Sequence, residues 1–352
     1  MIKFDKVQAL IERENLDALI IMSDHNRRYL SRFTGSSGAL VITSNQRYLL
    51  SDFRYNVQAQ QEATEFEFVL QEKGLLESIV NLLNETGAKR VGFEGEHVNY
   101  NTYKLLNDSF ELIALTGEIE EIRMIKNSEE LKLIKEACRI ADQSYEHILT
   151  FVQPGMTELE VKNELEAHMT KLGASGPSFD TIVASGYRGA LPHGVASDKV
   201  IESGDMVTLD FGAYYKGYAS DITRSFGVGA VSPEMENIYN IVLESQLKAL
   251  AEIKAGMTGK EADSISRDVI SANGYGKNFG HSLGHSFGLE VHEQPGLSQK
   301  SNTVLKPGMC ITIEPGIYVD GLGGVRIEDD AVVTENGLEK LTHSRKELFI
   351  IE

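Results

Sequence analysis

The sequence predicts an α/β domain followed by a larger α+β domain. In residues 1–122 short apolar strand patterns alternate with helical patterns, whereas residues 123–352 begin with long helices and turn to strands after Val304. Alternating strands and helices are typical of α/β folds, and segregated ones are typical of α+β folds. The 352 residues are also enough for about two domains of roughly 150 residues each. We therefore place a domain boundary at residue 122.

The elements of the first domain follow from periodicity and apolar runs. In chain order we expect a helix at 6–15, strands at 18–22, 39–43 and 47–52, a helix at 75–83 and a strand at 90–93.

The second domain is predicted to open with a helical stripe over residues 121–142, for which Asn127 or Ser128 is a suitable N-cap. Further helices are expected at 158–172, 233–254 and 260–273, before strands that continue to Ile351.

Composition restricts the class of protein. Apolar residues make up 41% and charged residues 24%, an ordinary balance for a soluble globular chain. No apolar run approaches the ~20 residues of a membrane span, and the N-terminus reads as an amphipathic helix without a signal-peptide core, so we expect a cytoplasmic protein that does not bind membranes. A net charge of −18 argues against a nucleic-acid partner. Cys138 and Cys310 are too few for a disulfide framework, and we expect both to be buried.

Residues 206–226 predict a hairpin with an acid on each arm. The segment 214–217 separates two strand-like runs, and folding it about its midpoint places Asp210 opposite Asp221. Opposed side chains in a sheet have Cβ atoms ~5 Å apart, so two carboxylates flanked by apolar residues repel each other unless a cation lies between them.

The pattern recurs in residues 311–334, where folding about Gly321 places Glu314 opposite Glu328. One such pair is more often a solvated face of a sheet than a ligand set. Two pairs together with a histidine cluster favour a metal site.

The histidine cluster is the stretch GHSLGHSFGLEVHE, with His281, His285 and His292. It is not a zincin motif, because Ser282 stands where that motif has glutamate. Four carboxylates and one neutral imidazole balance two divalent cations, and an oxygen-rich ligand set favours Mn, Co or Fe. Two such ions can share and acidify a water molecule, which is hydrolytic chemistry.

These residues, within LDFGAYYKGYASDITRSF, GHSLGHSFGLEVHE, TIEPGIY and VRIEDD, resemble the ordered ligand set of the pita-bread metallopeptidases. That family includes methionine aminopeptidase, aminopeptidase P and prolidase. The resemblance implies an α+β pita-bread (creatinase/aminopeptidase-like) catalytic domain at 123–352, preceded by a smaller α/β creatinase-type domain at 1–122. It also implies two divalent ions per chain, with Mn preferred and Co, Fe or Zn as alternatives, and five ligands: Asp210, Asp221, His285, Glu314 and Glu328.

The resemblance implies further roles. Asp221 and Glu328 would bridge both ions, and Glu314 would also shuttle a proton. His193 and His292 would hydrogen-bond the substrate carbonyl and the tetrahedral intermediate, and His281 and Arg326 would line the proline side of the pocket. Thr223 would support a metal ligand or the bridging water. Ser286 stands where the motif frequently has glycine.

Arg326 and His281 resemble the Xaa-Pro peptidases within the family, as does NRRYLSRFTGSSGALVIT in the first domain. The expected activity is therefore metal-dependent hydrolysis of the bond between an N-terminal residue and a following proline, by an aminopeptidase P-like enzyme. A prolidase, which accepts only dipeptides, is the alternative. A creatinase-like C–N hydrolase and a non-catalytic binding module are more remote. Family members commonly dimerise, so a homodimer is expected.

Overall fold

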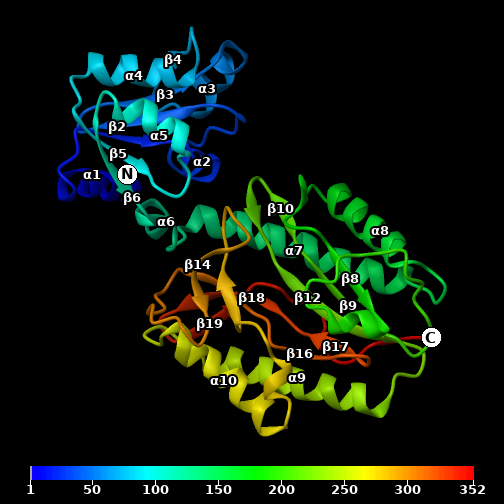
Figure 1. Cartoon of the computed structure of the whole chain (residues 1–352). Coiled ribbons are helices and arrows are strands. Elements are labelled where there is room, and N and C mark those ends of the chain that lie inside the picture. The colour runs from blue at the N-terminus through cyan, green and yellow to red at the C-terminus, as the bar shows by residue number, and fades with distance from the viewer. Residues whose placement is uncertain (1) are drawn as a thin grey trace. The chain divides into compact units, whose positions relative to one another are not determined.

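The computed structural model describes residues 2–352, with side chains from Lys3 onward, and the chain divides into two units after Arg123 (Figure 1).

The N-terminal unit is built on a six-stranded mixed sheet with the order β4-β3-β2-β1-β5-β6. The strands are β1 (Ala18–Ile21), β2 (Ala39–Thr43), β3 (Arg47–Ser51), β4 (Glu67–Leu70), β5 (Arg90–Glu94) and β6 (Glu111–Leu115). The helices are α1 (Ile2–Arg13), α2 (Asp24–Ser31), α3 (Asn56–Glu62), α4 (Leu75–Glu85), α5 (Tyr100–Asn107) and α6 (Glu118–Arg123).

Both faces of this sheet are covered, as β1 illustrates. Leu19 and Ile21 belong to one apolar cluster, and Ala18 and Ile20 belong to another. Successive side chains of a strand point to opposite faces, so a strand that is buried on both sides must be apolar throughout. The continuous apolar run at β1 therefore reflects its central position between β2 and β5.

Four long helices belong to the C-terminal unit: α7 (Ser128–Phe151), α8 (Glu158–Lys171), α9 (Pro233–Glu252) and α10 (Gly259–Ala272). Within the predicted helical stripe at 121–142, α6 ends at Arg123 and α7 begins at Ser128, which agrees with the predicted N-cap at Asn127 or Ser128. Asn127 is the N-cap of α7 and forms a reciprocal capping box with Glu130, which satisfies two helix-end groups at once.

The strands of this unit form several sheets whose pairings are antiparallel, except that β20 pairs with β12 in parallel. One has the order β20-β12-β9-β8, another has the order β14-β13-β15-β18-β19, and smaller ones contain β16 with β17 and β7 with β10 and β11. Their bounds are β7 (Gly176–Pro177), β8 (Ile182–Ser185), β9 (Met206–Phe211), β10 (Ala213–Tyr215), β11 (Tyr218–Ala219), β12 (Ile222–Val228), β13 (Gly284–Ser286), β14 (Glu293–Leu297), β15 (Cys310–Ile313), β16 (Gly316–Val319), β17 (Gly323–Arg326), β18 (Asp329–Thr334), β19 (Gly337–Lys340) and β20 (Ile350–Ile351).

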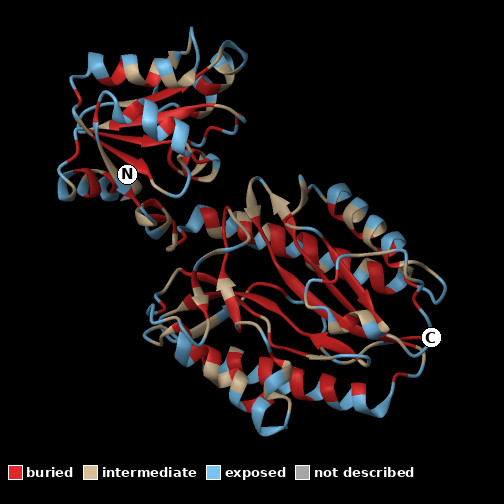
Figure 2. Cartoon of the chain, viewed as in Figure 1, coloured by how far each residue is buried: buried red, intermediate tan, exposed pale blue. Residues whose placement is uncertain are grey.

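Within the C-terminal unit the strands lie between two helical layers, with α7 and α8 on one side and α9 and α10 on the other (Figure 1). The buried faces of the helices turn toward the strands, of which β8, β9, β12, β15 and β17 are buried along their whole length (Figure 2). This is the helix-and-sheet layering of the pita-bread fold predicted from the sequence. Across residues 2–352, every helix is too short or too polar to cross a lipid bilayer.

Candidate active site

The hairpin that carries Asp210 and Asp221 is closed by a two-residue turn. Lys216 and Gly217 both have positive φ, 47° and 83°, as a tight type I′ hairpin requires. Across this turn Tyr215 pairs with Tyr218. The centre of the turn thus lies between Lys216 and Gly217, one residue later than the sequence pattern suggested.

This shift changes which residues face each other. The register that continues from the turn pairs Asp210 with Thr223 in β9 and β12. The prediction that Asp210 directly opposes Asp221 is therefore wrong. Asp221 lies two residues before Thr223, and since side chains alternate along a strand it is a diagonal neighbour of Asp210 rather than its partner.

The second acidic pair has the predicted register. β15 pairs with β18, and β16 pairs with β17, in the register obtained by folding the chain about Gly321. Glu314 and Glu328 lie between these two paired segments, so the common register sets them across from each other. Each stands where one strand ends and the next begins.

Three of the predicted ligands meet directly. Ligand atoms of Asp221, His285 and Glu328 lie within 4.8 Å of one another. The Nε2 atom of His285 is 3.5 Å from Asp221 Oδ2 and 3.4 Å from Glu314 Oε1, which brings the fourth residue to the same point. The two hairpins and the glycine-rich stretch therefore converge on one buried centre.

Asp210 joins the centre through Thr223 and Arg326. Its carboxylate accepts a hydrogen bond from Arg326, whose Nε donates to Thr223 Oγ1 over 3.1 Å. Thr223 in turn donates to Glu328 Oε2 over 2.6 Å. The hydroxyl thus links the predicted ligand Glu328 to the guanidinium beside Asp210.

His281 lies on the Arg326 side of this centre, where Tyr318 connects the two. The Tyr318 hydroxyl is 2.8 Å from His281 Nε2 and 2.6 Å from Arg326 NH1, which donates to it. Burial, followed by the charge of Arg326 and smaller contributions that include His193, lowers the pKa of His281 to about 4. His281 is therefore neutral at pH 7.

The remaining two histidines are exposed. The ring of His292 lies 4.3 Å from the ring of His285, measured between centroids. His193 lies on the loop after β8, close enough to His281 for its charge to act on that imidazole. Exposed imidazoles at the edge of a buried centre are placed to contact a bound molecule.

The buried carboxylates of the centre carry negative charge that cations would stabilise. Burial, followed by the charges of Glu328 and Asp210, raises the pKa of Asp221 well above its usual value, and burial raises the pKa of Glu314 to about 8. Burial and then the charge of His292 lower the pKa of His285 to about 4, so its imidazole is neutral and able to ligate a metal.

Two carboxylate oxygens of the centre also have no protein partner. Among the described residues, neither Asp210 Oδ1 nor Glu328 Oε1 has a hydrogen-bond partner, although both atoms are buried. Buried oxygens of this kind are costly unless a donor or a metal satisfies them. The residues present therefore fit a pair of divalent cations.

Several supporting residues were not assigned from the sequence. Tyr318 was within the quoted TIEPGIY motif, but its contacts with His281 and Arg326 depend on the fold. Thr312 accepts from the backbone N–H of His285 over 3.1 Å and donates to Glu314 Oε1 over 3.1 Å, so one hydroxyl connects two predicted ligands. Only the period-2 alternation that puts Thr312 and Glu314 on one face could have indicated this.

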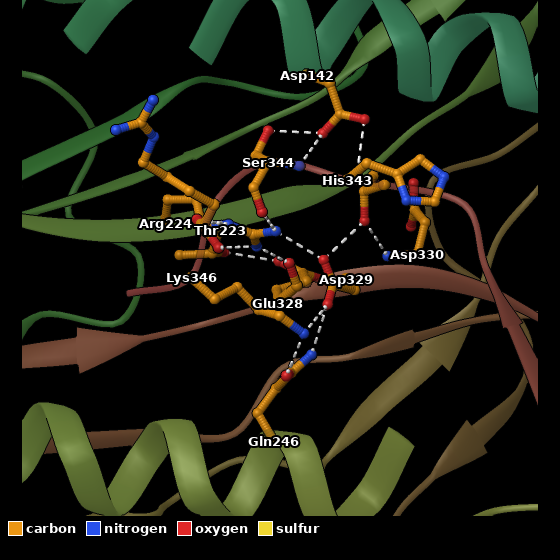
Figure 3. Close-up of polar contacts among 12 residues, drawn as sticks. Asp142, Thr223, Arg224, Gln246, Glu328, Asp329, Asp330, His343, Ser344 and Lys346 are labelled. Atoms are coloured by element: carbon orange, nitrogen blue, oxygen red, sulfur yellow. Dashed lines mark hydrogen bonds and ion pairs between the residues drawn. The ribbon is translucent and has the colours of Figure 1, made fainter. Parts of the chain in front are cut away.

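A buried charge network lies directly behind Glu328 (Figure 3). Arg224 donates to the backbone carbonyl of Glu328, to Asp329 Oδ1 over 2.7 Å and to the carbonyl of Ser344 over 2.9 Å. Lys346 Nζ reaches Asp329 Oδ2 over 2.7 Å. The network ties the segment that contains Glu328 to the C-terminal segment of the chain.

A buried cluster of carboxylates and one neutral histidine, set in a pita-bread fold, defines a metal-dependent hydrolase. Comparison with known families agrees. Residues 132–335 match the model of metallopeptidase family M24, and residues 3–125 match the creatinase/prolidase N-terminal domain. The chain belongs to metallopeptidase family M24.

Similar proteins cover the whole chain. An uncharacterised peptidase of Bacillus subtilis is 50% identical, over 99% of this chain and all of that protein. The structure of an Xaa-Pro dipeptidase from Bacillus anthracis is 49% identical, with a TM-score of 0.97 over 99% of both chains. The structure of an X-Pro aminopeptidase from Thermotoga maritima is 41% identical, with a TM-score of 0.91 over 97% of this chain and 99% of that one.

Proposed function

We propose that this chain is a dinuclear-metal Xaa-Pro peptidase, which hydrolyses the bond between an N-terminal residue and a following proline. The observation that carries the proposal is the convergence of Asp221, His285, Glu314 and Glu328 on one buried point, with carboxylate oxygens that lack protein partners. The similar chains from Bacillus anthracis and Thermotoga maritima, named for Xaa-Pro cleavage, support the substrate class.

The proposed ligand set comprises five residues. Asp210 would hold one ion, Asp221 and Glu328 would hold both, and His285 and Glu314 would complete the second. Manganese is the preferred ion, since the donors are four carboxylates and one imidazole. When bound, two such ions acidify a water molecule and polarise a substrate carbonyl.

The side chains around the ions carry out the proton transfers. Glu314 accepts the proton of the attacking water and returns it to the proline nitrogen as the peptide bond breaks, the role of a general base and then a general acid. His193 and His292, both exposed at the edge of the centre, donate hydrogen bonds to the carbonyl oxygen as negative charge develops on it.

The proline side of the substrate is assigned to His281 and Arg326. Tyr318 holds these two side chains together through hydrogen bonds of 2.8 Å and 2.6 Å. Thr223 keeps Glu328 in place through its 2.6 Å hydrogen bond. The pocket wall and the predicted bridging ligand are thus connected by one set of hydrogen bonds.

Substrate length separates the two forms of the proposal. The aminopeptidase P-like form cleaves longer peptides, and the prolidase form cleaves dipeptides alone. The test is product release from Ala-Pro and Ala-Pro-Ala by manganese-loaded and chelator-stripped protein. Metal-dependent cleavage of the tripeptide supports the aminopeptidase, and cleavage of the dipeptide alone supports the prolidase.

Two other results would overturn the proposal. Turnover that resists the chelator would favour a creatinase-like C–N hydrolase, and a metal-loaded protein that cleaves neither peptide would favour a binding module. We further propose a cytoplasmic homodimer, which light scattering coupled to gel filtration and cell fractionation test directly.

A further inference from the structure

The loop that carries His193 is closed at its base by a single buried carboxylate. The loop runs from Ser185, the last residue of β8, to Ser197. Glu158, the first residue of α8, has an exposed fraction of 0% and lies between the two ends of the loop. A fully buried glutamate is rare unless hydrogen bonds or a cation compensate its charge.

Both ends of the loop donate to Glu158. Its Oε1 accepts from the backbone N–H of Ser185 over 2.8 Å and from the Ser185 hydroxyl over 2.9 Å. Its Oε2 accepts from the backbone N–H of Ser197 over 3.1 Å and from the Ser197 hydroxyl over 2.7 Å. One carboxylate therefore fixes the start and the end of the loop relative to each other.

Arg188, within the same loop, compensates the charge. Its guanidinium forms an ion pair with Glu158 Oε2 and donates to the backbone carbonyl of Val195 over 2.9 Å. Val195 lies two residues beyond His193, and its backbone N–H donates to the carbonyl of His193 over 2.9 Å. We call Glu158 and Arg188 the loop clamp.

Helix capping does not account for Glu158. Thr157 is the N-cap of α8 and forms a complete capping box with Glu160, so the helix start is already satisfied. Among the described residues, the Glu158 side chain instead accepts all its hydrogen bonds from the His193 loop. Its burial therefore serves the loop rather than the helix.

The clamped loop also touches the strand that carries Arg326. A Cβ atom on Gly189 would lie 2.9 Å from the backbone nitrogen of Gly324, and one on Gly324 would lie 2.1 Å from the carbonyl oxygen of Gly189. Gly324 is in β17, which ends at Arg326. The clamp thus fixes the two ends of the loop, and the backbone of β17 packs against its middle at Gly189.

We propose that Glu158 and Arg188 are positioning residues, which fix the His193 loop so that the imidazole meets the substrate carbonyl. This inference rests on the proposed function, because it gives His193 a substrate to contact. Within residues 3–352, the clamp forms no hydrogen bond or ion pair with the predicted metal ligands, so we expect it to act on His193 and to leave metal binding intact.

The decisive experiment compares Glu158→Gln, His193→Ala and the double variant in manganese-loaded, full-length protein. We expect Glu158→Gln to lower kcat/KM about 10- to 100-fold, the usual scale for a misplaced catalytic group. Bound manganese, measured by elemental analysis, stays at the wild-type level. In the His193→Ala background the same substitution causes no further loss, because residues that act through one another are non-additive.

Glu166→Gln is the matched control. Glu166 is on the same helix and accepts a hydrogen bond from Thr181 over 2.8 Å, but it makes no contact with the clamped loop. It should keep the wild-type kcat/KM. The clamp would be refuted if Glu158→Gln left kcat/KM unchanged. It would also be refuted if Glu158→Gln lowered kcat/KM by the same factor in the His193→Ala background as in the wild-type protein.

A measurement independent of activity separates the clamp from the proposed function. Hydrogen exchange should become faster in residues 186–196 of Glu158→Gln and stay unchanged around Asp221 and Glu328. If hydrogen exchange in the loop is unchanged in Glu158→Gln, the clamp is wrong, whether or not the wild-type protein cleaves Xaa-Pro peptides. If exchange becomes faster but the wild-type protein cleaves no Xaa-Pro peptide, the proposed peptidase function is wrong and the structural role of Glu158 in the loop stands. If Glu158→Gln does not fold, Ser197→Ala is the substitute, because it removes the hydrogen bond from the Ser197 hydroxyl to Glu158. Hydrogen exchange in residues 186–196 must then become faster in Ser197→Ala.

Discussion

Glu328 and Asp329 are adjacent acids with similarly deep burial, yet their electrostatic environments are opposite. Among the described residues, the Glu328 carboxylate accepts one hydrogen bond, from Thr223, and its other oxygen has no partner. Asp329 instead accepts from Arg224, Gln246, Lys346 and Thr342 (Figure 3). The charge of Asp329 is compensated by protein cations, whereas Glu328 keeps an oxygen that is available to a metal ion.

The pKa values express the same difference. Burial, and then the charges of Glu314 and Asp210, raise the pKa of Glu328 well above its usual value. Burial also acts to raise the pKa of Asp329, but Arg224 and Lys346 outweigh it and the pKa is lowered. Of these two neighbours, the acid predicted to bind metal has no hydrogen bond from a protein cation, whereas Asp329 is paired with two cations and anchors the surrounding segments.

The largest effect is expected from Glu328→Gln, which keeps the shape of the side chain and removes its charge. Loss of a partner behind a metal ligand typically costs 10–100-fold, so loss of the ligand itself should cost at least about 100-fold in kcat/KM. Elemental analysis should show less than two bound ions. Near-normal turnover at saturating manganese would refute the assignment of Glu328 as a ligand.

Next in size is Arg224→Met on the compensated side. The substitution removes one of the two cations that pair with Asp329, since Lys346 remains, and it removes the donor to the backbone carbonyls of Glu328 and Ser344. Removing one partner of a buried pair costs about 3–5 kcal/mol of the free energy of unfolding. Urea unfolding of the C-terminal unit measures this cost. As a matched control, Arg345→Met removes an exposed pair with Glu146 and should cost no more than about 1 kcal/mol. Equal costs would mean that Asp329 is not anchored by Arg224.

Binding of manganese should stabilise the wild-type protein more than Glu328→Gln. A ligand that binds only the folded protein adds about 2.7 kcal/mol at 100 times its dissociation constant. The wild-type protein should gain about this stability on metal addition and lose it on chelation, whereas Glu328→Gln should gain less. Thermal unfolding with and without chelator gives the answer, and equal gains in both proteins would show that Glu328 does not bind the ion.

The smallest effect is expected from Tyr318→Phe. The variant loses the hydroxyl that joins His281 to Arg326 but no predicted ligand, so kcat/KM should fall about tenfold, equivalent to ~1.4 kcal/mol. Manganese content should remain that of the wild type. A loss of metal instead would place Tyr318 in support of the ligands rather than of the pocket wall.

The sequence predicted the fold class and the acids of the site because these depend on local patterns. Alternating apolar residues located the strands, and the symmetry of the segment around Gly321 gave the correct register for Glu314 and Glu328. The other register failed by one residue, because only the backbone angles show that Lys216 and Gly217 form the turn.

The remaining features depend on contacts between distant segments. Glu158 and Ser197 are far apart in the chain, and nothing in the residues around either one indicates a partner. Likewise, the acids of the EDD segment look alike in the sequence, and only the arrival of Arg224 and Lys346 from other segments distinguishes Asp329 from Glu328. Periodicity reports which face a side chain occupies, not which distant charge it meets.

The contact between Gly189 and Gly324 has a consequence for protein engineering. Because backbone meets backbone there, the position of the loop does not depend on what its outward-facing side chains are. Tyr187, Leu191 and Val195 on the same loop are 62%, 53% and 50% exposed. A library that varies these three residues and keeps both glycines can therefore change the surface beside His193 while it preserves the backbone contact between the loop and β17.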